Sequence, residues 1–416
     1  MGVDGNQEPQ AEDLHLEDSM PSTFDVLGAK IHGEYGNVLE FQSIAENVQH
    51  KLRPDDVLIK VSFTDVNPVD LQKLRGNDNM VGRSVEHPPH VPGYGGSGTV
   101  VGVGSAIQQD TDTTAAADSW KGQRVCFLAD PARMGSYATY VVVDVNCIAK
   151  IPPLSQPSRC YPNRDDDALS VLRDCASIPV AGLTAYESLA KCGLVMPFES
   201  AANTEIDDGA CNFKRSSSSL LVVGASGGVG SWTITLARAL NPRLEIIATA
   251  SNQVQHEWCL SLGADRVIRH EEIASRLKGG RDGSVDAIVC LAEPTQELFG
   301  ALSEVVKPYG TICLVVAGKS IASLNLGFFF FKCVDVKTET VFSSIRTKYR
   351  NIVPAKELAF IIGLLASGKI KAPLSPELEN GNISESFRDA LGNKGVLKAL
   401  SEPTGRRGNF VMKIDW

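Results

Sequence analysis

The architecture of this chain can be read outward from the stretch Ser219-Leu-Leu-Val-Val-Gly-Ala-Ser-Gly-Gly-Val-Gly-Ser-Trp-Thr-Ile-Thr-Leu-Ala-Arg-Ala-Leu240. An apolar run of strand length ends in a Gly-rich turn, and Trp232, Leu236 and Leu240 then recur at helical spacing. The stretch therefore predicts a strand, a tight turn and a helix. Such a turn lets a ligand approach the backbone closely, and the N-terminus of the following helix attracts phosphate groups.

The turn follows the pattern G-x-G-x-x-G, with Ala225 in place of the first glycine. A second apolar strand, Leu244 to Ala250, comes at the distance that a βαβ unit requires. We therefore expect a dinucleotide pyrophosphate to bind at Ala225, Ser226, Gly227, Gly228, Val229 and Gly230. The alternative, a structural turn without a ligand, is disfavoured by the two flanking strands.

The composition is that of a globular protein with two domains: 416 residues, of which 43% are apolar and 21% charged. A net charge of -9 gives no support to binding of nucleic acid or of an anionic membrane. No apolar run reaches the ~18 residues of a membrane span, and the longest, Leu324 to Phe331, is expected to form a buried strand. Residues 1–23 are acidic and predict a disordered tail on a cytoplasmic protein.

Short strands separated by Gly and Pro in the first 150 residues predict a small β-barrel-like domain: Val57 to Phe63, Gly98 to Val103, Arg124 to Leu128 and Tyr137 to Val143. Two polar segments are predicted to be insertions, Gln108 to Ser119 at the surface and Phe198 to Ser219 as a disordered connection.

Helices and strands alternate through the second half of the chain, which predicts a doubly wound parallel sheet. The expected helices are Pro179 to Ala190, Val254 to Leu262 and a segment ending at Val306, and the expected strands are Asp265 to Ile268, Val285 to Leu291 and Gly310 to Val316. Two helices should follow, Ala355 to Ser367 and Ser384 to Leu391. The last strand, Asn409 to Ile414, should return to the first domain.

Five segments in order resemble the medium-chain dehydrogenase/reductase superfamily, and within it the zinc-independent quinone oxidoreductase-like branch. They are Val66 to Gly76, Val91 to Val101, Ile178 to Glu187, the Gly-Gly-Val-Gly turn, and Leu262 to Ile268. The resemblance covers nearly all of residues 25–416 and implies an α/β protein. It implies a GroES-like β-barrel domain over 24–177 and 348–416, a Rossmann doubly wound parallel-sheet domain over 178–347, and a nicotinamide cofactor in the cleft between them.

The same comparison predicts no metal site. Where zinc alcohol dehydrogenases have a cysteine ligand, this chain has Asn67, and where they have Gly-His-Glu it has Gly93-Tyr94-Gly95. The thiolate and imidazole ligands of a catalytic zinc ion are therefore missing.

The end of the second strand of the dinucleotide unit indicates which cofactor binds. An NAD enzyme places an acid there for the ribose 2′-hydroxyl, and Ile246 to His256 contains neither Asp nor Glu. Ser251 and Asn252 can instead donate hydrogen bonds to a 2′-phosphate, although the loop has no Lys or Arg. NADPH is therefore the expected cofactor.

Without zinc, conjugated acceptors such as quinones or α,β-unsaturated carbonyls remain feasible substrates for hydride transfer, because they delocalise the incoming charge. Asn67 can donate a hydrogen bond to the carbonyl or hold the Pro68 turn. Tyr94 can face the cleft or pack over the barrel. Thr184, by the resemblance, lies near the nicotinamide, and its alternative is a helix-capping hydroxyl.

The expected protein is thus an NADPH-dependent quinone or enone oxidoreductase with a small-molecule substrate. The alternative is a catalytically weak scaffold or regulator of the same fold that binds NADPH. The resemblance also implies a homodimer, formed near Leu324 to Phe331. Pocket residues of this family come from variable loops, so the sequence does not identify the substrate.

Overall fold

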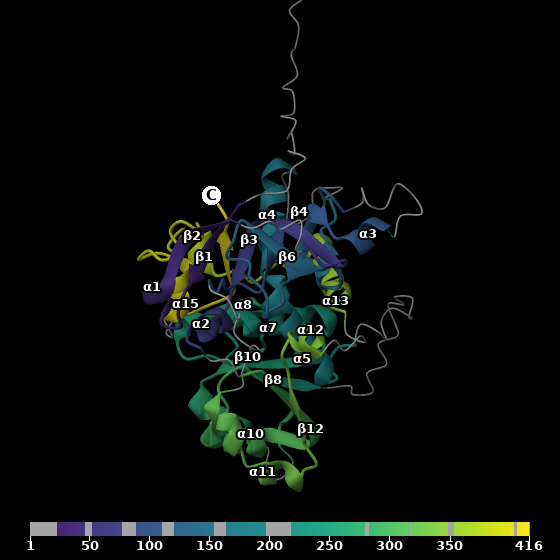
Figure 1. The fold of residues 1–416 in the computed structure, drawn as a ribbon. Helices are drawn as coiled ribbons and strands as arrows, with labels where there is room; N and C mark the ends of the chain where they lie inside the picture. The colour runs from purple at the N-terminus through teal and green to yellow at the C-terminus, as the bar shows by residue number, and fades with distance from the viewer. Residues whose placement is uncertain are drawn as a thin grey trace, which may run out of the picture.

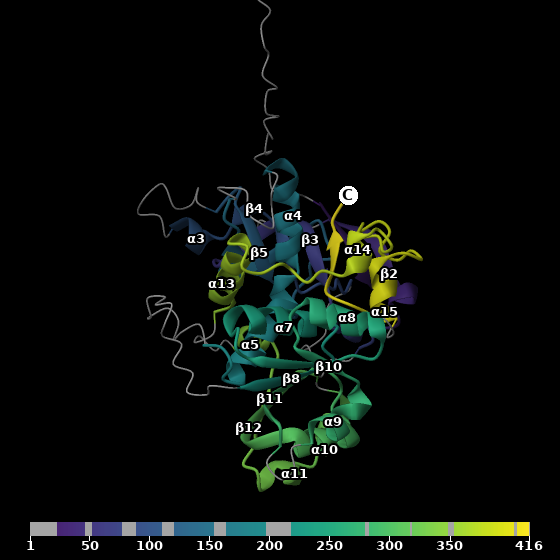
Figure 2. The same ribbon diagram turned by 180° about the vertical axis from the view of Figure 1, so that it is seen from behind.

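The computed structural model describes residues 23–45, 52–76, 89–109, 120–153, 164–196, 218–278, 283–316, 318–347, 353–402 and 406–415. One six-stranded sheet lies in the upper half of the molecule and the other in the lower half in both views, with several helices between them (Figures 1 and 2). The predicted tail lies outside the described residues except for Thr23, which begins β1, and so do residues 110–119 and 198–217 of the two predicted insertions.

One sheet is parallel throughout, in the order β10-β9-β8-β11-β12-β13. Its strands are β8 (Ser219–Val223), β9 (Glu245–Thr249), β10 (Arg266–Ile268), β11 (Val285–Cys290), β12 (Val306–Leu314) and β13 (Asp335–Thr338). Every residue of β8 is buried, as its unbroken apolar run predicts for a strand covered on both faces. The predicted doubly wound Rossmann sheet is confirmed.

Helices cover both faces of this sheet (Figure 2). One face carries α5 (Leu183–Lys191), α7 (Gly228–Leu240) and α8 (Gln253–Ser261), and the other carries α9 (Ile273–Leu277) and α10 (Gln296–Val305). A π-helical turn, Ile178–Gly182, comes immediately before α5. The predicted helix from Pro179 is therefore regular only from Leu183.

The other sheet is antiparallel, in the order β14-β3-β4-β5-β7, with β6 also paired to β3. Its strands are β3 (Asp56–Val66), β4 (Gly95–Val103), β5 (Arg124–Leu128), β6 (Tyr140–Asp144), β7 (Ile148–Lys150) and β14 (Phe410–Lys413). A hairpin of β1 (Thr23–Ala29) and β2 (Leu39–Ala45) accompanies it. This is the GroES-like domain, and the pairing of β14 with β3 confirms that the last strand returns to it.

The remaining helices are α1 (Tyr35–Val38), α2 (Pro68–Leu74), α3 (Ser105–Gln109), α4 (Arg164–Ala176), α11 (Gly327–Phe330), α12 (Ser343–Thr347), α13 (Pro354–Ala366), α14 (Pro376–Glu379) and α15 (Val396–Ser401). The helix α13 agrees with the predicted helix Ala355 to Ser367, whereas α2 and α4 are not among the predicted helices. The boundaries of the two domains at residues 177/178 and 347/348 stay a prediction.

Two predicted elements are wrong. Ser384 to Leu391 forms turns and isolated bridges, and α15 follows instead at Val396. The serine side chains explain this, because Ser384 Oγ bonds Asp389 and accepts from the backbone N–H of Ser386, which favours turns over helix.

The second wrong element is the buried strand over Leu324 to Phe331. The segment makes turns and the short helix α11, because Asn325 Oδ1 accepts from Gly327 N and bends the chain. Only Phe329 of the four phenylalanines is buried, against Phe299 at a ring distance of 4.7 Å.

The described residues include no single helix long and apolar enough to cross a membrane, although one bent helix pair, Ala168–Ala176 with Ile178–Lys191, passes the length and composition test when taken together.

Candidate active site

The Gly-rich turn joins the end of β8 to the start of α7. Gly224 adopts a φ of 79°, a left-handed conformation that favours glycine. A Cβ on Gly230 would lie 2.5 Å from Ala225 O, so this glycine lets the helix pack closely on the turn. A Cβ on Gly227 would meet only Gly224 O, at 3.8 Å, so the space beside Gly227 is open. The turn therefore has a closed side and an open side.

The open side fits a pyrophosphate. Among the described residues no side chain caps the N-terminus of α7, so backbone N–H groups of its first turn are available to bind phosphate oxygens. Ser226 and Ala225 are buried in the turn, whereas Val229 is half-buried. These six residues of the turn, 225–230, lie together as predicted, and their role in cofactor binding stays a prediction.

The last residues of the chain form one wall of this turn. Gly408 N donates to Ser226 O at 2.9 Å, and a Cβ on Gly228 would lie 2.3 Å from Asn409 Oδ1. Asn409 Nδ2 in turn donates to Ser177 O at 3.0 Å. Sequence reasoning missed this wall, because nothing in the local pattern of residues 406–409 indicates that β14 returns them to the turn.

The loop after β9 lies next to the turn. Thr249, at the end of β9, accepts from Gly224 N at 3.0 Å. Ser251 and Asn252 follow and are both exposed. Asn252 Oδ1 caps α8 by accepting from Gln255 N at 2.9 Å, which leaves its amide nitrogen available as a donor.

Asn67, in the turn between β3 and α2, and the segment Gly93-Tyr94 before β4 are tied together by one buried carboxyl group. Asp70 accepts from Asn67 N at 2.7 Å, from Gly93 N at 3.1 Å and from the Tyr137 hydroxyl at 3.1 Å. It thus ties the turn between β3 and α2 to the segment before β4. Burial raises the pKa of Asp70 from 3.8 to about 7, although these hydrogen bonds oppose the rise.

The Asn67 amide has a donor to spare. Asn67 is the N-cap of α2, in a capping box with Asp70, so the structural role expected as its alternative is present. Its side chain also lies beside the buried Asp65, where its hydrogen bonding opposes the rise of the Asp65 pKa that burial causes. Neither Asn67 Nδ2 nor Asp65 Oδ1, however, has a partner with full hydrogen-bond geometry among the described residues.

Tyr94 is fully buried at the domain junction. Its ring meets Phe342, from the segment after β13, edge-on at 5.4 Å, and Lys73 Nζ lies 5.3 Å from the ring centre. The Tyr94 hydroxyl is a second buried donor without a hydrogen-bond partner among the described residues. Burial raises its pKa well above the usual range, so the phenol keeps its proton.

Thr184 lies in the first turn of α5 and is 5% exposed. The N-cap of α5 is Gly182, so Thr184 does not have the capping role considered as its alternative. The preceding π-helical turn contacts the other candidates indirectly: Val180 N donates to Asp65 at 3.2 Å. Within the described residues no hydrogen bond joins Thr184 to Asn67 or Tyr94.

These residues do not fit a zinc ion. An amide and a protonated phenol stand at the positions of the cysteine and histidine ligands, and both are poor zinc ligands. The described part of the chain holds no group of three or more His, Cys, Asp or Glu side chains that could bind a metal ion.

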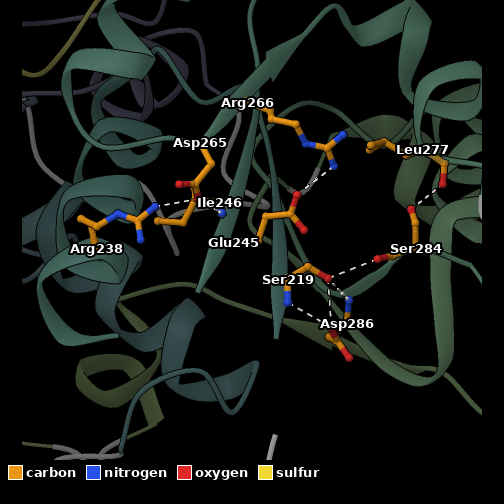
Figure 3. A network of polar contacts seen from close by, with 9 residues as sticks. All are labelled: Ser219, Arg238, Glu245, Ile246, Asp265, Arg266, Leu277, Ser284 and Asp286. Carbon is orange, nitrogen blue, oxygen red and sulfur yellow. Dashed lines mark hydrogen bonds and ion pairs between the residues drawn. The ribbon is translucent and has the colours of Figure 1, made fainter. Parts of the chain in front are cut away.

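A polar network joins the opposite, amino-terminal edge of the parallel sheet (Figure 3). Ser219 donates from its backbone and its hydroxyl to Asp286, at 3.0 and 2.9 Å, and links β8 to β11. Arg238 of α7 bonds Asp265 at 2.7 Å, and Asp265 also accepts from Ile246 N. Because the Gly-rich turn follows the carboxyl end of β8, this network stabilises the sheet away from the candidate site.

Comparisons with known proteins agree with this architecture. Residues 53–153 match the family described as alcohol dehydrogenase GroES-like domain, and residues 228–358 match zinc-binding dehydrogenase. A zinc-type alcohol dehydrogenase-like protein of Staphylococcus aureus is 30% identical over 272 residues, 65% of this chain and 67% of that protein. An NADPH-dependent alkenal/one oxidoreductase, chloroplastic, of Arabidopsis thaliana is 31% identical over 245 residues, 58% of this chain and 52% of its own.

Solved structures share the fold at lower identity. The quinone oxidoreductase from Coxiella burnetii superposes with a TM-score of 0.66 at 20% identity, covering 94% of this chain and all of that one. A thermostable alcohol dehydrogenase from Pyrobaculum aerophilum gives 0.65 at 18%, with the same coverage. The chain belongs to the medium-chain dehydrogenase/reductase family, a family of oxidoreductases that bind a nicotinamide cofactor.

Proposed function

We propose that this protein reduces quinones or α,β-unsaturated carbonyl compounds with NADPH, by hydride transfer and without a metal ion. The observation that carries the proposal is a pair of buried donors at the positions of two zinc ligands. The Tyr94 hydroxyl has no hydrogen-bond partner among the described residues, and Asn67 Nδ2 has only the buried Asp65 carboxyl beside it. A buried donor without a partner costs about 1–3 kcal/mol, which a ligand oxygen at this site would offset.

The bound cofactor supplies the hydride, and the residues of the chain orient the acceptor and stabilise its oxygen. Asn67 Nδ2 and the Tyr94 hydroxyl are suited to donate hydrogen bonds to an oxygen that gains negative charge. Asp70 is a positioning residue, because it holds the backbones of Asn67 and Gly93 at a fixed separation. Phe342 packs on Tyr94 and excludes water from its ring.

The name of the Arabidopsis relative includes NADPH and an alkenal or alkenone substrate, which supports the proposed cofactor and substrate class. The loop after β9 supports NADPH independently, since Ser251 and Asn252 offer donors and no carboxylate repels a 2′-phosphate.

Steady-state assays with a panel of quinones, enals and enones test the proposal through the loss of NADPH absorbance. Asn67→Ala and Tyr94→Phe should each lower kcat roughly tenfold or more, because a hydrogen bond to a charged group contributes about 1.5–3 kcal/mol. The dissociation constant of NADPH should not change. Tyr186→Phe is the matched control, since the Tyr186 hydroxyl bonds Met196 O and lies outside the site.

If NADPH binds and no acceptor in the panel is reduced, the protein is better described as a cofactor-binding scaffold. Activity that is lost on chelation and restored by zinc would overturn the metal-free mechanism.

A further inference from the structure

The loop after β9, which carries Ser251 and Asn252 and is called the cofactor loop below, has no basic residue that could pair with a 2′-phosphate. The inference that a cation comes from another segment rests on the proposed use of NADPH. A phosphate monoester carries close to two negative charges near neutral pH. Ser251 and Asn252 offer neutral donors, and the segment from Ile246 to His256 contains neither Lys nor Arg. A cation from elsewhere in the fold would complete the site.

The C-terminal segment reaches this loop. Gln255, in the first turn of α8, accepts from Ser251 N at 3.2 Å and donates to Arg406 O at 3.1 Å. One glutamine side chain therefore separates the backbone of Arg406 from that of Ser251. Gly408 N fixes the other side of the segment on Ser226 O at 2.9 Å. Both ribbon views place α8 beside α15, the helix that precedes this segment (Figures 1 and 2).

The Arg406 side chain has capacity for an anion. Its Nη1 donates to Leu400 O at 2.9 Å, which uses one of the five N–H groups of a guanidinium. Arg406 has no ion pair with a carboxylate among the described residues. Burial lowers the pKa of this arginine, because desolvation disfavours the cation and no negative group compensates.

Arg407, the next residue, differs from Arg406 in its ion pairing. Arg407 forms an ion pair with Glu377 of α14, and its charge is therefore neutralised within the GroES-like domain. The two adjacent arginines therefore differ. Arg407 is paired with a carboxylate, whereas the Arg406 guanidinium bonds only the backbone oxygen of Leu400 among the described residues, and the Arg406 backbone is held by Gln255 next to Ser251.

We propose that Arg406 binds the 2′-phosphate of NADPH, together with Ser251 and Asn252. A guanidinium can engage two phosphate oxygens at once, which gives both affinity and orientation. The cation for cofactor selection would then come from the C-terminal segment rather than from the loop that follows β9. The short segment 406–409, which leads into β14 of the GroES-like domain, would then also help to select the cofactor.

Calorimetric titration of the full-length protein with 2′,5′-ADP, NADPH and NADH tests the assignment. Arg406→Gln should weaken binding of 2′,5′-ADP and NADPH roughly tenfold or more, equivalent to at least about 1.4 kcal/mol, and leave NADH within about twofold. Arg388→Gln removes the same charge at an exposed site, where the guanidinium bonds Asp415 O, and should change none of the three affinities. Arg406→Lys should keep part of the preference, and thermal melting of each variant checks its fold.

An equal loss for NADH and NADPH would mean that Arg406 serves the pyrophosphate or the fold, and would overturn the proposal, as would unchanged affinities in a folded variant. A wild-type protein that binds NADH more tightly than NADPH would instead contradict the proposed function itself. If the wild type prefers NADPH and Arg406→Gln has the same ratio of NADPH affinity to NADH affinity, only the assignment of Arg406 is refuted.

Discussion

Gly227 and Gly230 stand three residues apart in one turn, but they need a small side chain for different reasons. Gly227 has an extended backbone, φ −73° and ψ 178°, which any residue can adopt, and it faces open space. Gly230 is enclosed, because a Cβ there would overlap the backbone of Ala225. The sequence pattern predicts both glycines without distinguishing these roles.

Substitutions at the two glycines should therefore separate binding from folding. Gly227→Leu should fold normally and weaken NADPH binding by more than tenfold, because the side chain would fill the space for the pyrophosphate. Gly230→Ala should lower the free energy of unfolding by about 1–3 kcal/mol through overpacking. Calorimetry and urea denaturation measure the two effects, with Gly363→Ala as the control at a helix position that has no neighbour within 4 Å. Unchanged NADPH affinity in folded Gly227→Leu would show that the cofactor does not bind at this turn.

Ser251 offers a direct test of cofactor selection. Its side chain is exposed, and within the described part of the chain only its backbone N–H forms a hydrogen bond, so Ser251→Asp should not disturb the structure. A carboxylate there repels a 2′-phosphate and can accept from a free ribose hydroxyl, so the preference should flatten or reverse towards NADH. The ratio of kcat/KM for the two cofactors measures this, and Ser261→Asp at the far end of α8 is the control. A wild-type enzyme that already prefers NADH would contradict the premise.

Residues whose importance comes from burial were harder to predict than residues in a motif. Asp70 lies in the family segment Val66 to Gly76, but its neighbours in the sequence do not indicate that it accepts from Asn67, Gly93 and Tyr137 at once. These partners lie up to 67 positions away in the chain. Arg406 was missed for the same reason, since Gln255, which binds its backbone oxygen, belongs to the other domain.

At the scale of secondary-structure elements, the sequence predicted best those strands that are buried along nearly their whole length. The central parallel strands β8, β9 and β11 are mainly apolar runs, and the structure buries nearly all of their residues. The segment from Leu324 to Phe331 is equally apolar but is bent by Asn325 and Gly327, which shows that hydrophobicity alone does not separate a strand from a short helix. The serine-rich Ser384 to Leu391 failed because side-chain hydrogen bonds compete with the helix.

The connection between the β3–α2 turn and the segment before β4 should depend on pH. Asp70 has a pKa raised from 3.8 to about 7 in the folded protein, so its contribution to stability is fully present below pH 3.8 and is lost as the pH rises through 7. The free energy of unfolding of the wild type, relative to Asp70→Asn, should fall by about 2–3 kcal/mol between about pH 5 and about pH 8. Urea denaturation at both pH values measures the difference. A difference that stays constant or grows with pH would contradict the raised pKa.

At the scale of the whole molecule, α11 lies at the end of the Rossmann domain farthest from the GroES-like domain (Figure 1), and several of the exposed aromatic side chains belong to this helix and its neighbours. Phe331 is 95% exposed and Phe330 is 75% exposed. Three further apolar side chains are exposed in β12 and in or next to α11: Tyr309, Leu326 and Phe328. The adjacent β13 is an edge strand of the parallel sheet. An apolar patch next to an open strand edge is typical of a protein interface, since both features favour association.

We therefore expect a homodimer in which this patch pairs with its symmetry mate, because a twofold axis lets one self-complementary surface cover two edges. Light scattering at micromolar concentration should give a particle of twice the 44.6 kDa chain mass. The double variant Phe330→Asp/Phe331→Asp should dissociate to the monomer, because two carboxylates buried without partners oppose association. Leu169→Asp places the same charge at an exposed apolar site on α4, in the other domain, and should remain dimeric. A wild-type particle of the chain mass itself would contradict the dimer and leave the exposed phenylalanines to another partner.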